Sequence, residues 1–173
     1  MRLFASLLSV FLLCVSLSPV PGAEKTTRVK PIVLQTREFV LIVPQSRDKL
    51  LAFSMESGDW SQTKVAGKPS AEALSKLQPT VSSAMGICPV GRDLYAYSSA
   101  SGNWSRLRVP EEAKFSYSVG DNFVFAQVET ETGTTEYYLF GKNSLEWSGV
   151  DLATGKLLMT SGENNKKPVK SSN

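Results

Sequence analysis

The sequence predicts an all-β protein built from three antiparallel repeat units. A motif of one aromatic residue, six further residues and a Trp-Ser pair occurs three times, and its tryptophans are 44 and 43 residues apart. A period of this size is typical of repeat architectures. Short segments rich in β-branched and aromatic residues surround each tryptophan, as expected for strands. The aromatic pairs are Phe53 with Trp60, Tyr97 with Trp104, and Phe140 with Trp147.

Each repeat contains four expected strands. They lie at 32–36, 39–43, 50–55 and 60–65 in the first repeat, at 81–84, 85–88, 94–98 and 104–109 in the second, and at 114–118, 122–128, 137–140 and 147–152 in the third. The repeats therefore span about 29–67, 80–112 and 113–155. Gly58 suits the positive φ that the turn between the third and fourth strands often needs.

One short helix is predicted near residues 70–77, between the first two repeats. Ser70 is a suitable N-cap, and Pro79 ends the helical segment. The first two repeats also align outside the tryptophan motif. Ile42-Val43-Pro44 matches Ile87-Cys88-Pro89, and Arg47-Asp48 matches Arg92-Asp93.

The N-terminus has the three-part organisation of a secretory signal peptide: positively charged Arg2, an apolar run over 3–17, and small residues at Gly22 and Ala23. The run is shorter than the roughly 20 residues that cross a membrane. We therefore expect a secreted or periplasmic (cell-envelope) protein with no membrane span after cleavage. The expected parts are a signal peptide (1–23), a single all-β domain (24–160) and a disordered basic tail (161–173).

An aromatic residue seven positions before a tryptophan, in a strand–turn–strand unit, resembles the kelch repeat of β-propellers. The best match is 97–104 with Leu107 and Pro110, and the resemblance covers about 29–152. It implies that each repeat is one blade, with one large aromatic residue packing between neighbouring units. Kelch repeats also carry paired glycines, which are absent here.

The number of repeats leaves the closure of the fold open. Propellers typically close with four to eight blades, so three blades imply either a homodimer that completes a ring or an open arrangement. Three units of about 40 residues also resemble a β-trefoil, which closes by itself. The β-trefoil is therefore the alternative fold.

Catalytic chemistry is sparse in this chain. It contains no histidine, and Cys88 is the only cysteine after the expected cleavage. The commonest general base and the usual zinc ligands are thus missing. Cys88 lies in an apolar strand and is expected to be a buried, inert thiol. We expect no enzyme activity, no metal site and no cofactor. The body of the chain is close to neutral, which argues against nucleic acid as a partner.

The loops between the second and third strands are the candidate ligand-binding site. Propellers gather these loops on one face. Arginine can grip a carboxylate or phosphate with two hydrogen bonds, although each Arg and Asp also suits stabilisation of its own turn. The candidate residues are Arg47, Asp48, Arg92 and Asp93 in the first two loops and Glu129 and Glu131 in the acidic third loop.

Three functions are consistent with these observations. The favoured one is an exported, non-catalytic binding or scaffold module with a protein or glycan partner. The second is a carbohydrate-binding trefoil-like domain with exposed aromatic platforms. The third is a fragment of a propeller-type hydrolase, which needs Asp48, Asp93 and Asp121 to converge. Asn103-Trp104-Ser105 is also a glycosylation acceptor sequence.

Overall fold

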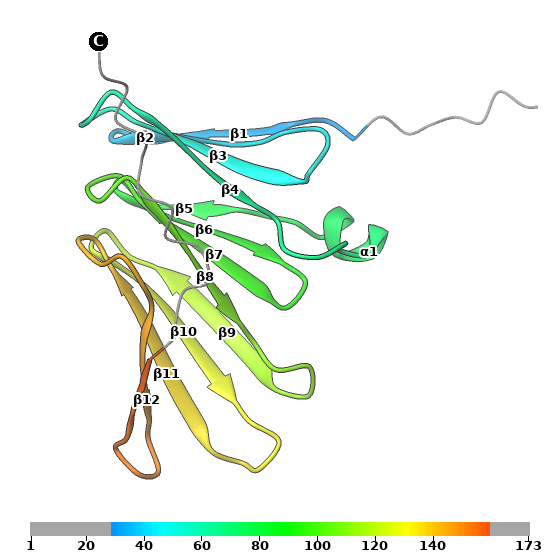
Figure 1. The fold of residues 1–173 in the computed structure, drawn as a ribbon, viewed down its shortest axis with the longest axis vertical. Coiled ribbons are helices and arrows are strands. Elements are labelled where there is room, and N and C mark those ends of the chain that lie inside the picture. Colours follow the sequence, from blue (N-terminus) through cyan, green and yellow to red (C-terminus); the bar gives the residue numbers. More distant parts are fainter. Residues whose placement is uncertain (1–28, 160–173) are drawn as a thin grey trace, which may run out of the picture.

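The computed structural model describes residues 29–159, so the expected signal peptide and basic tail lie outside the described residues. The described chain folds into three antiparallel sheets of four, four and five strands with one short helix (Figure 1). This confirms the all-β class and the helix. No helix within residues 29–159 is long and apolar enough to cross a membrane.

In each sheet, every strand pairs with the strand that follows it along the chain. The first sheet contains β1 (Ile32–Gln35), β2 (Phe39–Val43), β3 (Lys49–Ser54) and β4 (Trp60–Lys64). The second contains β5 (Thr80–Val81), β6 (Met85–Val90), β7 (Asp93–Ser98) and β8 (Asn103–Arg108). The third contains β9 (Lys114–Val119), β10 (Phe123–Glu129), β11 (Thr135–Gly141), β12 (Ser148–Asp151) and β13 (Leu157–Met159).

The strands lie close to their expected positions because the sequence alternates apolar and polar residues at the period of a strand. In β2 the side chains alternate between buried and half-buried. The helix α1 (Ala71–Ser75) also forms as predicted, and the Ser70 hydroxyl accepts a hydrogen bond from the Ala73 N–H at 3.1 Å. Gly58 adopts a φ of 73° in the β3–β4 turn.

Two strands differ from the prediction. The expected strand 81–84 is reduced to the two residues of β5, because the chain turns immediately afterwards. The Ser82 N–H donates to the Met85 carbonyl at 2.8 Å and closes this turn. The third sheet gains a fifth strand, β13, which pairs with β12.

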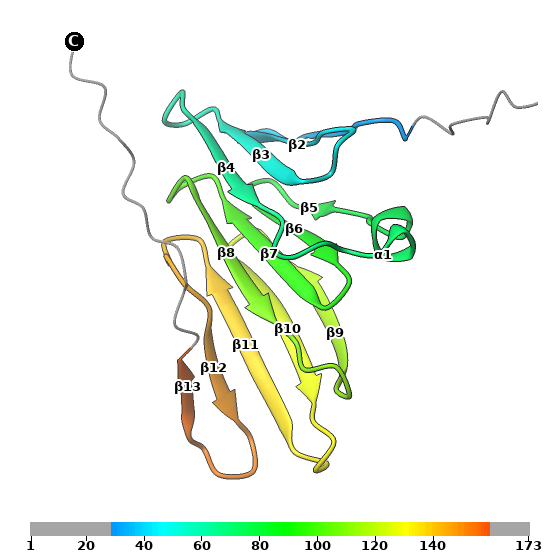
Figure 2. The same cartoon turned by 45° about the vertical axis from the view of Figure 1, so that its right-hand side comes forward.

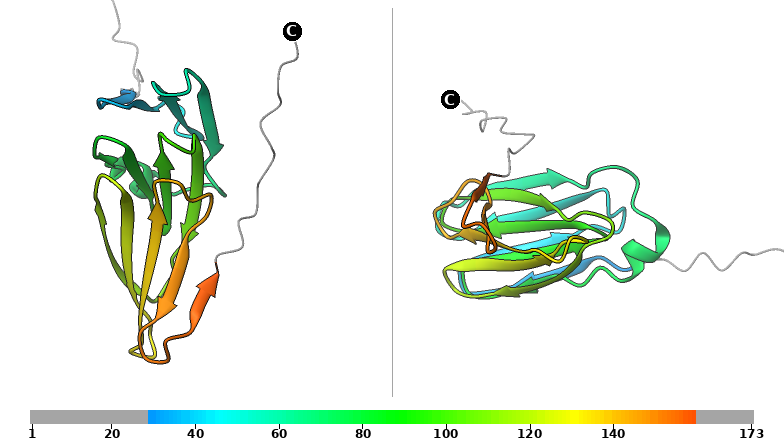
Figure 3. Two further views of the ribbon diagram at one scale, coloured as in Figure 1. Left: turned by 90° about the vertical axis from the view of Figure 1, so that its left-hand side faces the viewer. Right: turned by 90° about the horizontal axis from the view of Figure 1, so that it is seen from below.

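The three sheets stack face to face, with the second sheet in the middle. Two separate apolar cores lie between them, one between the first and second sheets and one between the second and third. Figures 2 and 3 show the first and third sheets at opposite ends of the stack, with their strand directions rotating from sheet to sheet. The sheets spread like a fan toward the end that carries α1 and the β10–β11 loop (Figure 1).

The strand register corrects one part of the sequence alignment. Ala52 pairs with Leu41 in the first sheet, and its counterpart Ala96 pairs with Ile87 in the second. Ile87 therefore corresponds to Leu41, so the match of Ile42-Val43-Pro44 with Ile87-Cys88-Pro89 is wrong by one residue. The cause is loop length, because five residues (44–48) connect β2 to β3 and only two (91–92) connect β6 to β7.

The same correction applies to the matched Arg-Asp pairs. The Asp48 carbonyl accepts from the Val65 N–H, and the Arg92 carbonyl accepts from the Val109 N–H, both at 2.9 Å. Asp48 thus corresponds to Arg92. The two Arg-Asp pairs are not equivalent positions of one repeated loop.

Candidate functional site

The repeated sequence motif is one cross-strand aromatic pair. Phe53 and Trp60 are direct partners across β3 and β4, with ring centroids 5.2 Å apart. Tyr97 and Trp104 are the corresponding partners across β7 and β8, at 5.1 Å. Phe140 and Trp147 form the third pair at 5.8 Å. The spacing of seven residues is the length of strand and turn that brings the two rings together.

The three tryptophans nevertheless have different environments. Trp147 is 2% exposed in the core between the second and third sheets, and its indole N–H donates to the Ser105 carbonyl at 3.3 Å. Trp104 packs, half-buried, in the core between the first and second sheets. Trp60 is 60% exposed. Each tryptophan faces the sheet that precedes its own, and the described chain contains no sheet before the first. Trp60 therefore does not pack between repeat units, contrary to expectation.

Arg47 does not present its guanidinium to solvent. The residue is buried and has a φ of 52°, the only positive φ of a non-glycine residue in the described chain. Its Nη2 donates to the Lys30 carbonyl at 3.4 Å, whereas Nε and Nη1 have no hydrogen-bond partner among the described residues. The adjacent Asp48 is exposed and accepts a hydrogen bond from the Ser46 hydroxyl, which lowers the pKa of its carboxyl.

Arg92 holds the connection between the second and third sheets. Its Nη1 donates to the Ala113 carbonyl at 2.5 Å, and its Nη2 donates to the Glu111 carbonyl. The guanidinium also lies 5.5 Å from the centre of the Phe115 ring, a cation–π arrangement. These contacts tie Nη1 and Nη2 of Arg92 to the segment that connects β8 to β9.

Asp93 is buried at the start of β7 and is neutralised by two arginines. The Arg108 Nη1 lies 3.2 Å from its carboxylate and the Arg106 Nε lies 3.8 Å away. Burial of a carboxylate without such partners is energetically costly. Asp93 therefore belongs to the internal bonding of the second sheet.

The acidic β10–β11 loop is exposed. Glu129 ends β10, Glu131 lies in the loop, and the hydroxyls of Thr130 and Thr134 are hydrogen-bonded to each other at 2.6 Å. Figure 1 places this loop at the same end of the sheets as the β2–β3 and β6–β7 loops. The fold thus brings the three loops to one end. It directs the two arginines into contacts between and within sheets, so the six predicted residues do not form one open site.

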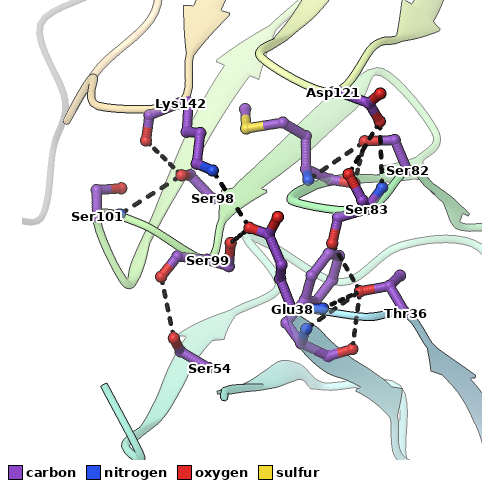
Figure 4. Close-up of polar contacts among 12 residues, drawn as sticks. Thr36, Glu38, Ser54, Ser82, Ser83, Ser98, Ser99, Ser101, Asp121 and Lys142 are labelled. Carbon is purple, nitrogen blue, oxygen red and sulfur yellow. Dashed lines mark hydrogen bonds and ion pairs between the residues drawn. The ribbon is translucent and has the colours of Figure 1, made fainter. Parts of the chain in front are cut away.

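The acidic residues required by the hydrolase hypothesis do not converge. Asp48 and Asp93 are at the end of the sheets that carries the β2–β3 and β6–β7 loops. Asp121 is in the β9–β10 turn at the opposite end, where its carboxylate accepts from the Ser83 hydroxyl at 3.1 Å (Figures 1 and 4). No group of three or more His, Cys, Asp or Glu residues within 29–159 is placed to hold a metal ion.

A polar network joins the sheets at the end opposite the acidic loop (Figure 4). The Ser54 hydroxyl donates to the Ser99 carbonyl at 3.0 Å, and the corresponding Ser98 hydroxyl donates to the Lys142 carbonyl. Thus one hydrogen bond recurs at both sheet–sheet boundaries. The serine that follows the aromatic residue in Phe53-Ser54 and Tyr97-Ser98 carries it. Sequence reasoning missed this role, although the recurrence of that serine was the available signal.

A second pair of sheet-to-sheet hydrogen bonds starts from equivalent donors in the turns before β2 and β6, although their acceptors differ by one position. The Thr36 hydroxyl donates to the Ser83 carbonyl and the Ser82 hydroxyl donates to the Gly120 carbonyl, both at 2.8 Å. These hydrogen bonds connect the second sheet to the sheets on either side of it.

The first sheet has an apolar face that no described segment covers. Its residues are cross-strand partners and therefore point to one side. Val33 is 58% exposed and Trp60 is the most exposed aromatic residue of this face. A shallow hollow of about 440 Å³ beside it is lined by Leu51, Trp60, Ser61 and Gln62. We call this surface the first-sheet open face and define it by Val33, Val40, Ile42, Leu51, Phe53 and Trp60.

The third sheet exposes an apolar face at the other end of the stack. Phe125 pairs with Leu139, Tyr137 with Val150, and Val150 with Leu157, so these side chains share one side of the sheet. Leu157 is 76% exposed, and Phe123 and Leu139 are also exposed. We call this surface the third-sheet open face and define it by Phe123, Phe125, Tyr137, Leu139, Val150 and Leu157. Exposed clusters of large apolar side chains are typical of interaction sites.

No protein-family model matches the sequence, and no curated protein matches it significantly. The two open faces are thus the features of the described chain that point most directly to an interaction.

Proposed function

We propose that this protein is an exported, non-catalytic binding or scaffold module of kelch-like, propeller-type blades that engages a polypeptide partner through its open faces. The observation that carries the proposal is the exposure of aromatic and aliphatic side chains at both ends of the stack, with Trp60 at one end and Leu157 at the other. Burial of apolar area is the main favourable contribution to protein association. Exposing both faces without a partner would favour aggregation.

The strand pairing supports blades over a trefoil. Each sheet is a meander of consecutive strands, and no strand in residues 29–159 pairs with a strand of another sheet. A trefoil barrel requires pairing between its three units. The equivalent aromatic pairs and the recurring serine hydrogen bonds support three copies of one structural unit.

Photo-crosslinking tests the proposed function. A photoreactive amino acid would replace Val33 on the first-sheet open face or Leu157 on the third-sheet open face, and Ser57 in the exposed β3–β4 turn as the control. We expect irradiation of the exported protein in its host to yield polypeptide adducts at Val33 and Leu157 and few at Ser57. Equal yields at all three positions would contradict a partner on the open faces.

A carbohydrate platform is the second candidate, and the exposure of Trp60 beside the hollow at Leu51 favours it. An exposed indole presents a flat apolar surface that suits a sugar ring. Titration of the protein with oligosaccharides tests it, because the fluorescence of Trp60 would change on binding. A Trp60→Phe variant is the control, since Trp104 and Trp147 are more buried and should not respond.

A further inference from the structure

We propose that the occupant of both open faces is a second copy of this chain, with the first-sheet open face of each copy packed on the third-sheet open face of the other. This rests on the proposed function and goes beyond it by naming the partner and the geometry. The result is a closed ring of six sheets from two chains.

The two open faces are opposite halves of an interface that the chain already forms twice. Phe39 and Leu41 of the first sheet pack against Tyr97 and Trp104 of the second. Phe53 and Trp60, the counterparts of Tyr97 and Trp104, belong to the first-sheet open face. This face is therefore of the type that receives a preceding sheet.

The third-sheet open face supplies the other half. Ile87 and Ala96 of the second sheet point toward the third, and Phe125 and Leu139 are on the corresponding side of the third sheet. This is the type of face that contacts a following sheet. Joining the two open faces thus repeats the internal packing, whereas joining two identical faces creates a contact that the chain does not contain.

Charge favours the same pairing. Lys49 and Lys64 are cross-strand partners at the edge of the first-sheet open face nearest the β2–β3 loop. Glu129 is at the corresponding edge of the third-sheet open face, next to Lys114, and Glu131 follows in the loop. Packing that repeats the internal interface brings these edges together, so the two lysines face Glu131 and the cross-strand pair of Glu129 and Lys114. Opposite charges at an interface fix its orientation.

Closure by two copies would prevent the contact from continuing into a filament. A head-to-tail contact gives a ring when its rotation closes and a fibre when it does not. The strand direction rotates from sheet to sheet (Figure 2), which directs further packing around a curve. A ring of two chains buries four apolar faces for one loss of translational and rotational freedom, whereas pairing of identical faces buries only two.

The third sheet lacks the side chains that donate the sheet-to-sheet hydrogen bonds, and this predicts how tightly two copies bind. Gly141 in the third sheet stands where Ser54 and Ser98 stand in the first and second, and Gly120 stands where Thr36 and Ser82 stand. The junction between copies therefore lacks both recurring hydrogen bonds. We expect a reversible dimer that dissociates on dilution.

Sedimentation equilibrium of the purified exported protein tests the inference. We expect the wild-type mass to shift from one chain to two as concentration rises. Trp60→Glu places a charge on the first-sheet open face, and Leu139→Glu places one on the third-sheet open face. The ring has two junctions, each between the first-sheet open face of one copy and the third-sheet open face of the other. A homodimer of either variant therefore carries a charge at both junctions. Each variant alone should lose at least tenfold in dimer affinity. Leu145→Glu, at an exposed leucine in the β11–β12 turn, is the matched control and should dimerise normally.

Mixing the two variants gives the decisive result. A mixed dimer of Trp60→Glu and Leu139→Glu carries both charges at one junction and leaves the other junction unmodified. We therefore expect the equimolar mixture to associate more tightly than either variant alone. Pairing of identical faces predicts instead that one of the two substitutions has no effect. Wild-type protein that is monomeric at 100 µM, or that forms fibres, would overturn the inference. If the wild-type protein is monomeric but photo-crosslinking at Val33 and Leu157 captures a different polypeptide, the dimer is ruled out and the proposed function still holds.

Folding of the variants is checked independently. Trp60 and Leu139 are exposed, so the circular dichroism spectra of both variants should match wild type. If Trp60→Glu fails to fold, Val33→Glu on the same face replaces it, and Leu157→Glu replaces Leu139→Glu. The prediction for the mixture is unchanged.

Discussion

Glu38 and Lys142 join the first and third sheets directly, although 104 positions separate them. The Lys142 Nζ lies 3.3 Å from a Glu38 carboxylate oxygen, and the Ser99 hydroxyl of the second sheet donates to the same oxygen at 3.0 Å. All three sheets thus meet at one carboxylate (Figure 4). Both partners of the ion pair are about two-thirds buried, so water screens it less than a surface pair.

The Glu38–Lys142 pair should contribute measurably to stability. We expect a double-mutant cycle with Glu38→Gln and Lys142→Met to give a coupling energy of about 0.5–1 kcal/mol in urea unfolding. The exposed Glu72–Lys76 pair of α1 is the control, because its ends are highly solvated. A coupling no larger than that of the control would show that the pair does not hold the sheets together.

The recurring serine hydrogen bonds should matter equally at both boundaries. We expect Ser54→Ala and Ser98→Ala each to lower the free energy of unfolding by about 1–2 kcal/mol, because each leaves a carbonyl of the next sheet unpaired. Chemical denaturation measures the change, and Ser57→Ala in the exposed turn is the control. Losses under about 0.5 kcal/mol at both sites would argue against this role.

The third sheet requires a glycine at position 149. A Cβ there would lie 2.6 Å from two ring carbons of Tyr138, which is itself packed against the core. We expect Gly149→Ala to destabilise the protein by about 1–3 kcal/mol, as overpacking does. Gly120→Ala is the matched control, since its nearest neighbour would be at 3.5 Å. Thermal unfolding compares the two, and equal melting temperatures would refute the packing argument.

Two equivalent tryptophans should differ in their effect on stability. Trp147→Ala empties a buried site, so we expect a loss of about 3–5 kcal/mol. Trp60→Ala should cost less than about 1 kcal/mol when the protein is dilute, because the residue is exposed in the single chain. Urea unfolding at low concentration measures both values. A large loss for dilute Trp60→Ala would mean that this indole is covered within one chain.

Cys88 should be unreactive in the folded protein. Burial raises the pKa of its thiol from 9.0 to about 12, while the nearby positive charge of Arg47 opposes the shift. The folded state therefore favours the neutral thiol. The raised pKa of Cys88 has no effect on the free energy of unfolding below pH 9, where the thiol is neutral in both states. As the pH rises from 9 toward 12, the unfolded state loses the thiol proton first, so the folded protein becomes less stable. Alkylation by iodoacetamide at pH 9 should be negligible in native protein and complete in denaturant. Rapid labelling of the native protein would contradict this burial.

The sequence determined the local structure because local structure depends on patterns within a few residues. Alternating apolar residues predicted the strands, Ser70 predicted the start of α1, and the spacing of Phe53 and Trp60 follows from one hairpin. The alignment of Arg47 with Arg92 is wrong because the β2–β3 and β6–β7 loops differ in length. Two identical Arg-Asp pairs in the sequence do not show that the residues occupy the same position in the strand register. Register is set by hydrogen bonding between strands, and the sequence does not display it.

Only the tertiary structure decided what each repeated residue contacts. Trp60, Trp104 and Trp147 occupy the same position in their hairpins, yet their exposure ranges from 60% to 2%. The difference arises because burial depends on whether another sheet lies against the residue, and that is a property of the stack and not of the motif. For the same reason the sequence did not show that Arg92 contacts the connection between the second and third sheets. The stack also leaves two apolar faces open at the ends of the molecule.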